Sequence, residues 1–153
     1  MRKVTYGIIS NFIGFSEIKN IQGAPEMMQC LNHIAIINVN KMPADKKSVD
    51  AVIAQKYEHF KAILLRQLKT YDPQIIIFGG TFRHFQNDLG IKDEELANYY
   101  NDKPMPRYRK PRYIVKNGKL YLDVYHPAQW MMAEADYVQS IIDIVKMNKE
   151  NIE

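Results

Sequence analysis

Three positions in this sequence carry groups that can bind a ligand, and each of them follows an apolar run. His126 comes after an apolar and aromatic run and is followed by a proline. Asn38 and the pair Gly79-Gly80 each come after a β-branched run. Imidazole and amide groups exchange hydrogen bonds with a ligand, and glycine lets the backbone approach it closely. The three positions therefore predict a small polar binding site.

The apolar runs are the elements that must position these groups. Short β-branched runs predict strands over 34–39 and 74–78, and Asn117-Gly118 predicts the turn of a hairpin over 113–125. Helical spacing of apolar residues predicts helices around the strands, with Ser48 as one cap. The expected helices cover 4–15, 25–31, 48–72, 82–89, 93–101 and 128–148.

The alternation of helices and strands over 153 residues predicts one α/β domain, residues 1–153. Because crossover connections between parallel strands are right-handed, helices should cover both faces of the sheet. The expected architecture has three layers, α/β/α, with a short and mainly parallel central sheet. In such sheets ligands bind beyond the carboxyl ends of the strands, where Asn38, Gly79-Gly80 and His126 would gather.

Composition limits the environment and the chemistry. The chain has 21 Lys and Arg against 17 Asp and Glu, and its net charge of +4 is compatible with a nucleic-acid partner. Cys30 is the only cysteine, which excludes an internal disulfide and favours a reducing, cytoplasmic location. No signal peptide or apolar span is recognisable, so no membrane partner is expected. Neither an HExxH pattern nor paired cysteines occur, so no metal and no cofactor are expected.

A proline-rich segment over 103–112 concentrates basic residues around a tyrosine. Arg107, Arg109 and Lys110 could hold the phosphates of a nucleic acid, and Tyr108 could stack on a base. The alternative is a solvated charged loop, as most runs of charge are. Both interpretations remain open from the sequence.

Three motifs together resemble the uracil-DNA glycosylase superfamily, and in particular a group of uncharacterised bacterial members. Residues 36–43 (IINVNKMP) are similar to a segment in which an asparagine ends a buried strand and a lysine and a proline follow. Residues 73–81 (PQIIIFGGT) look like the next strand, which ends in glycine, and residues 126–128 (HPA) resemble the histidine-proline motif. The order and spacing of the motifs agree over roughly residues 34–130.

The resemblance implies a DNA glycosylase that excises uracil or a related damaged base by hydrolysis of the N-glycosidic bond. Asn38 would read a flipped-out base through its amide, and Lys41, Gly79 and Gly80 would belong to the same substrate site. His126 would be the catalytic residue, because its hydrogen bond to the base carbonyl would stabilise the departing uracil anion. The implied partner is DNA, single- or double-stranded.

One motif of the superfamily has no counterpart here. It lies on a strand ahead of the asparagine strand and positions the attacking water, and residues 1–33 read as helices and loops. Either the first strand is missing, with a chain that is incomplete at its N-terminus, or another segment replaces it. Two functions therefore stay open: a glycosylase, and a non-catalytic nucleic-acid- or nucleotide-binding module of the same fold. A missing central strand would leave unpaired strand edges, which favour a homodimer.

Overall fold

The computed structural model describes residues 1–20, 25–42, 49–101, 103 and 108–152. The α-helices are α1 (Arg2–Ile9), α2 (Asp50–Tyr71), α3 (Phe82–Phe85) and α4 (Glu134–Asn148). The strands are β1 (Ile75–Gly79), β2 (Ala97–Asn98), β3 (Arg112–Lys116) and β4 (Lys119–Val124). Short 3-10 helices cover Phe15–Glu17, Pro25–His33, Asp93–Glu95 and Lys149–Asn151. The predicted cap Ser48 and the basic residue Arg107 lie outside the described residues.

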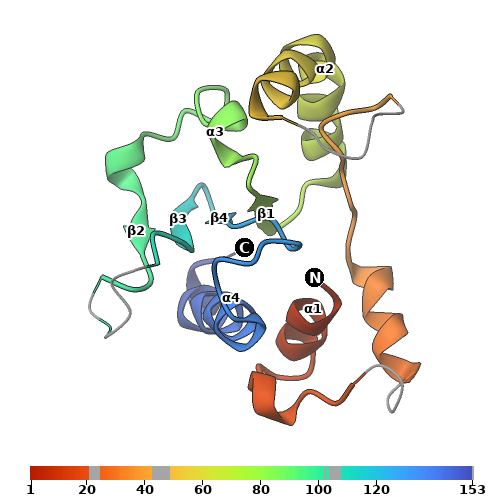
Figure 1. Cartoon of the computed structure of the whole chain (residues 1–153), viewed down its shortest axis with the longest axis vertical. Helices are drawn as coiled ribbons and strands as arrows, with labels where there is room; N and C mark the ends of the chain where they lie inside the picture. Colours follow the sequence, from red (N-terminus) through yellow and green to blue (C-terminus); the bar gives the residue numbers. More distant parts are fainter. Residues whose placement is uncertain (21–24, 43–48, 102, 104–107, 153) are drawn as a thin grey trace.

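The strands form one mixed sheet in the order β1-β4-β3-β2 (Figure 1). β1 pairs in parallel with β4, whereas β3 is antiparallel to both β4 and β2. The hairpin of β3 and β4 turns at Asn117-Gly118, where both residues have positive φ, as the sequence predicts. The α/β class is therefore confirmed. The mainly parallel sheet is not confirmed, because the hairpin and β2 contribute antiparallel pairings.

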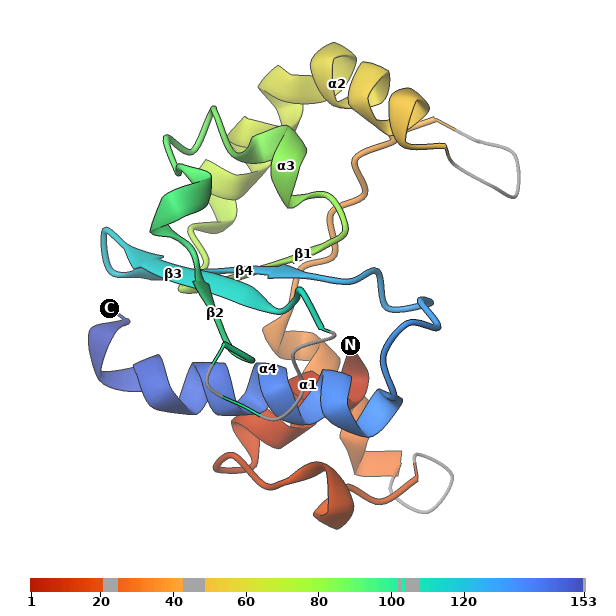
Figure 2. The ribbon, with the colours of Figure 1, turned by 60° about the vertical axis from the view of Figure 1, so that its left-hand side comes forward.

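Helices lie on both faces of the sheet, with α1 and α4 on one side and α2 and α3 on the other (Figure 2). The side chains of β4 alternate between these layers, since successive strand residues point to opposite faces. Leu120, Leu122 and Val124 belong to the core beside α4. Tyr121 packs against the second core, which Phe78 shares with residues of α2 and α3. Burial on both faces explains why the β4 run is almost continuously apolar.

The strand predicted over 34–39 is wrong. The segment is irregular and does not join the sheet, and Ile36 is 76% exposed. It passes the edge of the sheet on its way from the layer of α1 to the layer of α2 (Figures 1 and 2). A chain that crosses the edge in this direction cannot align its backbone with β1, so its β-branched composition is not enough to make a strand. Ile37 and Val39 still pack in the core beside α2.

Helix boundaries differ from the predicted ones at several places. α1 ends at Ile9, because Asn11 and the residue after it have a left-handed φ of 61° that a helix cannot continue. α3 keeps only the first turn of the predicted 82–89 helix, and 93–101 contains a 3-10 helix and β2 in place of an α-helix. α2 ends as predicted, because Asp72 is left-handed and a proline follows it.

One edge of β1 is open, in that no strand of the described residues pairs with it. The N–H of Leu120 donates to the carbonyl of Gln74 (2.9 Å), and the N–H of Gly80 donates to the carbonyl of Val124 (2.9 Å). Pairing with a parallel neighbour alternates along a strand, so the even-numbered residues of β1 turn their backbone groups toward β4. The residues that turn their N–H and C=O groups to the open edge are Ile75, Ile77 and Gly79.

Candidate functional site

The carboxyl ends of β1 and β4 lie side by side and bring two of the predicted groups together. Gly79 is in register with Val124. A Cβ atom added at Gly79 would lie 3.0 Å from Cδ of Pro127, and one added at Gly80 would lie 3.7 Å from Cβ of His126. Gly80 also has a φ of 76°, which a residue with a side chain rarely adopts. The glycine pair therefore permits both the turn after β1 and the close passage of the loop that carries His126.

His126 is exposed, and its own loop fixes the orientation of its ring. The N–H of Ala128 donates to Nδ1 of His126 (3.2 Å), and the N–H of Gln129 donates to the carbonyl of His126 (2.9 Å). Because Nδ1 accepts a hydrogen bond, the proton of the neutral imidazole is on Nε2, which has no partner among the described residues and can donate to a ligand. The helix predicted over 128–148 begins instead at Glu134, so His126 lies in a loop and not at a helix N-terminus.

The loop after His126 presents the only tryptophan of the chain to solvent. The side chain of Gln129 closes this loop, because its Nε2 donates to the carbonyl of Met132 (2.9 Å) and its Oε1 accepts from the N–H of Met132 (2.8 Å). Met132 is buried, whereas Trp130 is 90% exposed and Met131 is exposed as well. The sequence does not predict the exposure of Trp130, because in a helix over 128–148 the ring could pack against a neighbouring element.

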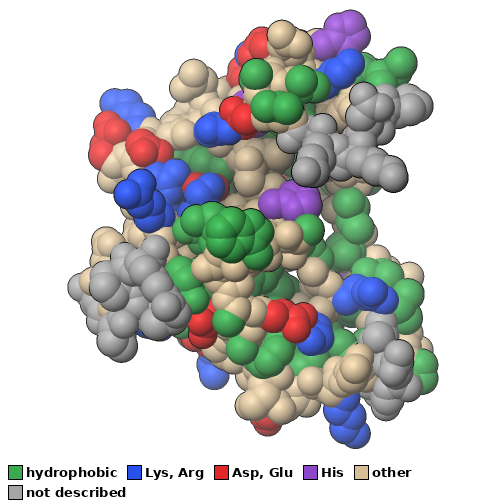
Figure 3. Space-filling model, viewed as in Figure 1, with side chains coloured by type: hydrophobic (Ala, Val, Ile, Leu, Met, Phe, Trp, Pro, Cys, Tyr) green, Lys and Arg blue, Asp and Glu red, His purple; other side chains and the backbone are tan. Residues whose placement is uncertain are grey.

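Figure 3 shows the corresponding face of the molecule. An exposed hydrophobic group lies near its centre, where the loop after β4 crosses the same view in Figure 1. Lys and Arg side chains lie on one side of this group and a histidine lies on the other. The exposed large hydrophobic residues of the loop are Trp130 and Met131. Exposed hydrophobic, cationic and imidazole side chains therefore share one face.

The basic segment reaches this face through Tyr125, the residue immediately before His126. The backbone N–H of Arg109 donates to the hydroxyl of Tyr125 (3.2 Å). The ammonium group of Lys110 lies 6.0 Å from the centroid of the Tyr125 ring, at the limit of a cation–π contact. Two of the predicted phosphate-binding residues are thus tied to the strand end that carries His126.

The predicted stacking residue of this segment, Tyr108, is buried, and its hydroxyl donates to Asp136 (3.2 Å). A buried ring offers no face to a base in this conformation. The aromatic ring that is open to stacking is that of Trp130.

Asn38 and Lys41 lie on the irregular segment that passes the sheet edge. Asn38 is exposed and Lys41 is half-buried. Among the described residues, no hydrogen bond or ion pair joins either side chain to His126, whose ring is held by Ala128 alone. The structure therefore brings together His126 and the glycine pair, and it does not attach Asn38 to them.

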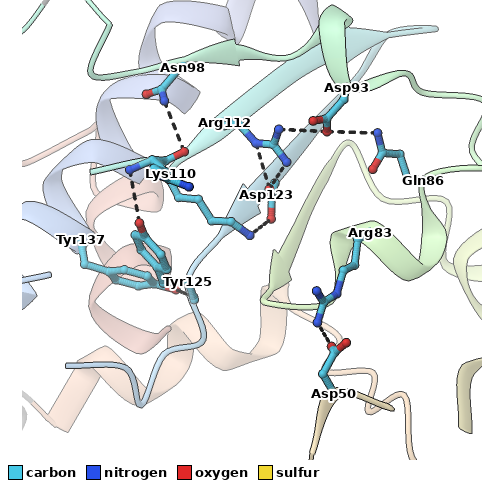
Figure 4. Close-up of polar contacts among 11 residues, drawn as sticks. Asp50, Arg83, Gln86, Asp93, Asn98, Lys110, Arg112, Asp123, Tyr125 and Tyr137 are labelled. Carbon is cyan, nitrogen blue, oxygen red and sulfur yellow. Dashed lines mark hydrogen bonds and ion pairs between the residues drawn. The ribbon is translucent and has the colours of Figure 1, made fainter. Parts of the chain in front are cut away.

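β4 also carries a buried carboxylate that no sequence pattern singled out, because it is one polar residue in an apolar run. Asp123 is 1% exposed. Lys110 donates to its Oδ1 (2.5 Å), and Arg112 donates to its Oδ2 through Nε (3.1 Å) and Nη2 (2.8 Å) (Figure 4). Arg112 also donates to Asp93 (2.9 Å). Burial lowers the pKa of Arg112, but the hydrogen bonds and charges of the two carboxylates outweigh it, and the pKa is raised.

A second polar cluster lies between α2 and α3. His84 is 8% exposed on its side chain, and its Nε2 lies 3.3 Å from Oδ1 of Asp50, yet it has no hydrogen-bond partner among the described residues. The Asp50 carboxylate is instead engaged by the guanidinium group of Arg83 (Figure 4). Burial, and secondly the charge of Arg83, lower the pKa of His84. The adjoining cleft of about 530 Å³ is lined by Ala54, Gln55, Tyr57, Glu58, Arg83, His84 and Asn87, and so does not include His126.

Within the described parts of the chain, no three His, Cys, Asp or Glu side chains are arranged to hold a metal ion. None of the described helices combines the length and apolar character that a membrane span requires. Comparison of the chain with protein families, curated proteins and solved structures finds no match.

Proposed function

We propose that the protein binds single-stranded nucleic acid on the face formed by His126, Trp130, Arg109 and Lys110. A base would stack on the indole ring, the Nε2–H of His126 would donate to a base or sugar oxygen, and the basic side chains would contact phosphates. The observation that carries the proposal is the exposed ring of Trp130, in the loop that follows His126 and that the side chain of Gln129 closes.

The physical reason is that an aromatic face and nearby cations suffice for binding single strands without sequence readout. Stacking of a base on an aromatic side chain contributes about 1–3 kcal/mol, and every base has a face that can stack. Cations beside the ring add the phosphate attraction that supplies most of the non-specific affinity. A net charge of +4 acts in the same direction.

Fluorescence of Trp130 tests the proposal directly, because no other tryptophan contributes to the signal. A single-stranded 12-nucleotide DNA of mixed sequence should quench the emission at low salt, since a stacked base quenches indole. The affinity should fall as salt rises, with a log–log slope of about −0.7 for each phosphate contacted. Emission that stays unchanged at low salt would refute the proposal.

A matched pair of variants separates stacking from folding. Trp130→Ala should weaken binding, measured by anisotropy of a labelled oligonucleotide, by roughly 5- to 150-fold. Because the ring is 90% exposed, the same change should alter the free energy of unfolding by less than about 0.5 kcal/mol. Trp130→Phe keeps an aromatic face and should retain most of the affinity. Equal affinity of all three proteins would argue against stacking.

Excision of uracil or a related base from DNA is a second candidate, favoured by the hydrogen bonding of His126. Its Nδ1 accepts from Ala128, so a neutral imidazole can donate through Nε2 to the oxygen of a leaving base. The finer fold assignment, a three-layer uracil-DNA glycosylase-like domain, belongs to this candidate. It is supported by the parallel β1–β4 pair whose ends carry Gly79-Gly80 and His126.

The two candidates give different results with one substrate. A uracil-containing oligonucleotide, incubated with the protein and then treated with alkali, should be cleaved only if the base has been removed. His126→Ala should abolish such cleavage. Binding without cleavage would support the non-catalytic binding module. In that case His126→Ala should only weaken the binding of the oligonucleotide.

A further inference from the structure

Two cations, Lys110 and Arg112, share one buried carboxylate at the end of β4, and Lys110 is the one that lies beside Tyr125. Burying Asp123 is costly unless its charge is paired and hydrogen-bonded. Arg112 alone supplies a charge and two hydrogen bonds to Oδ2. Lys110 donates to the other oxygen, Oδ1, so the buried carboxylate and the ammonium group fix each other in place.

The ammonium group of Lys110 lies between this carboxylate and the strand end that carries His126. Its side chain is 25% exposed, so the ammonium group reaches water while one of its protons is donated to Asp123. The same group lies beside the ring of Tyr125, which leads directly into His126. A free lysine samples many rotamers and loses that freedom on contact with a ligand, whereas Lys110 has been ordered in advance.

We propose that Asp123 is a positioning residue: its buried carboxylate holds the ammonium group of Lys110 beside Tyr125, where it contacts a phosphate of the bound strand. The inference rests on the proposed nucleic-acid binding of this face and names the phosphate contact within it. Arg112 has a different role. Its guanidinium group donates to both Asp123 and Asp93, and it therefore anchors the Asp123 carboxylate (Figure 4).

The sign of one substitution distinguishes positioning from simple charge attraction. If Asp123 acted only through its charge, removing an anion from beside the face would strengthen the binding of a polyanion. If Asp123 positions Lys110, removing the carboxylate releases the lysine and binding weakens. Asp123→Asn keeps the shape of the side chain and removes the charge. Asp93→Asn is the matched control, because it removes an exposed carboxylate from the same network that does not touch Lys110.

The experiment measures the anisotropy of a fluorescein-labelled, single-stranded 12-nucleotide DNA across a salt series, with each variant kept below its unfolding temperature. Asp123→Asn should weaken binding by about 3- to 10-fold and lower the salt slope by about 0.7, the value for one phosphate. Lys110→Met should do the same, and the double variant should bind no more weakly than Lys110→Met alone. Asp93→Asn should bind as tightly as the unchanged protein or slightly tighter.

Tighter or unchanged binding by Asp123→Asn, together with weaker binding by Lys110→Met, would overturn the positioning role and leave the proposed function intact. No binding by the unchanged protein would overturn the proposed function, and this inference with it. If Asp123→Asn does not fold, Lys110→Met is compared with Arg109→Met, since the Arg109 guanidinium has no ion-pair partner among the described residues. The held lysine should then account for the larger loss, and an equal or smaller loss would overturn the inference.

Discussion

The stability of this protein should fall on mild acidification because of His84. Its imidazole is almost fully buried between α2 and α3, and the nearest carboxylate, Asp50, is taken up by Arg83. Burial and the Arg83 charge lower the pKa of His84 below its ordinary value of 6.5. The folded protein therefore resists protonation at a position where the unfolded chain accepts a proton.

The sign and the limit of the effect follow from proton linkage. As the pH falls through 6.5, the unfolded state binds one proton more than the folded state, so the free energy of unfolding decreases. The loss is at most about 1.4 kcal/mol per pH unit for one group, and it stops below the pKa of the folded state. Asp88 acts in a lower window, because the hydrogen bonds of Lys61 and Tyr57 lower its pKa from 3.8 and its contribution is lost only below that value.

Urea unfolding at pH 7.5 and at pH 5 measures the difference, with His84→Gln as the variant that cannot titrate. The unchanged protein should be less stable at pH 5, and His84→Gln should lose most of this difference. A protein that becomes more stable at pH 5 would refute the reasoning, because it would mean that an ion pair with Asp50 raises the pKa of His84. An equal pH dependence in both proteins would assign the effect to another group.

Three further substitutions test the fold by the same urea titrations. Gly80→Ala should cost about 1–2 kcal/mol, since φ at Gly80 is 76°, and a neutral result would mean that the turn after β1 relaxes. Leu122→Ala should cost about 2–5 kcal/mol because the side chain is fully buried beside α4, whereas a small cost would place it outside the core. Ile36→Ala should change stability by less than about 0.5 kcal/mol, and a large loss would show that the segment is packed in solution.

The parts of the fold that the sequence predicts well are those with local signals. Asn117-Gly118 can form a tight turn with few alternatives, and the hairpin around it is present. The long helix α2 ends where Asp72-Pro73 requires. The strand β1 and the glycine pair at its end follow from a short apolar run that ends in residues able to turn. In each case neighbouring residues carry the information.

The parts of the fold that the sequence does not predict depend on contacts between residues that are distant in the chain. The β-branched run at 34–39 has the composition of a strand, but a strand needs a partner aligned with it, and the chain crosses the sheet edge there. The segment after His126 has apolar spacing suited to a helix, yet the Gln129 side chain closes a loop and α4 begins at Glu134. In the sequence Asp123 is one polar residue in an apolar strand, and its role depends on Lys110, which only the folded structure places beside it.

The open edge of β1 has a consequence for hydrogen exchange. Along this strand, amide protons that face β4 are bonded, and those of Ile75, Ile77 and Gly79 face the open edge. Exchange rates should therefore alternate residue by residue, with Ile76 and Phe78 protected and their neighbours exchanging faster. If the alternation in exchange rates along β1 disappears as the protein concentration rises, the open edge is the place where two copies of the chain meet.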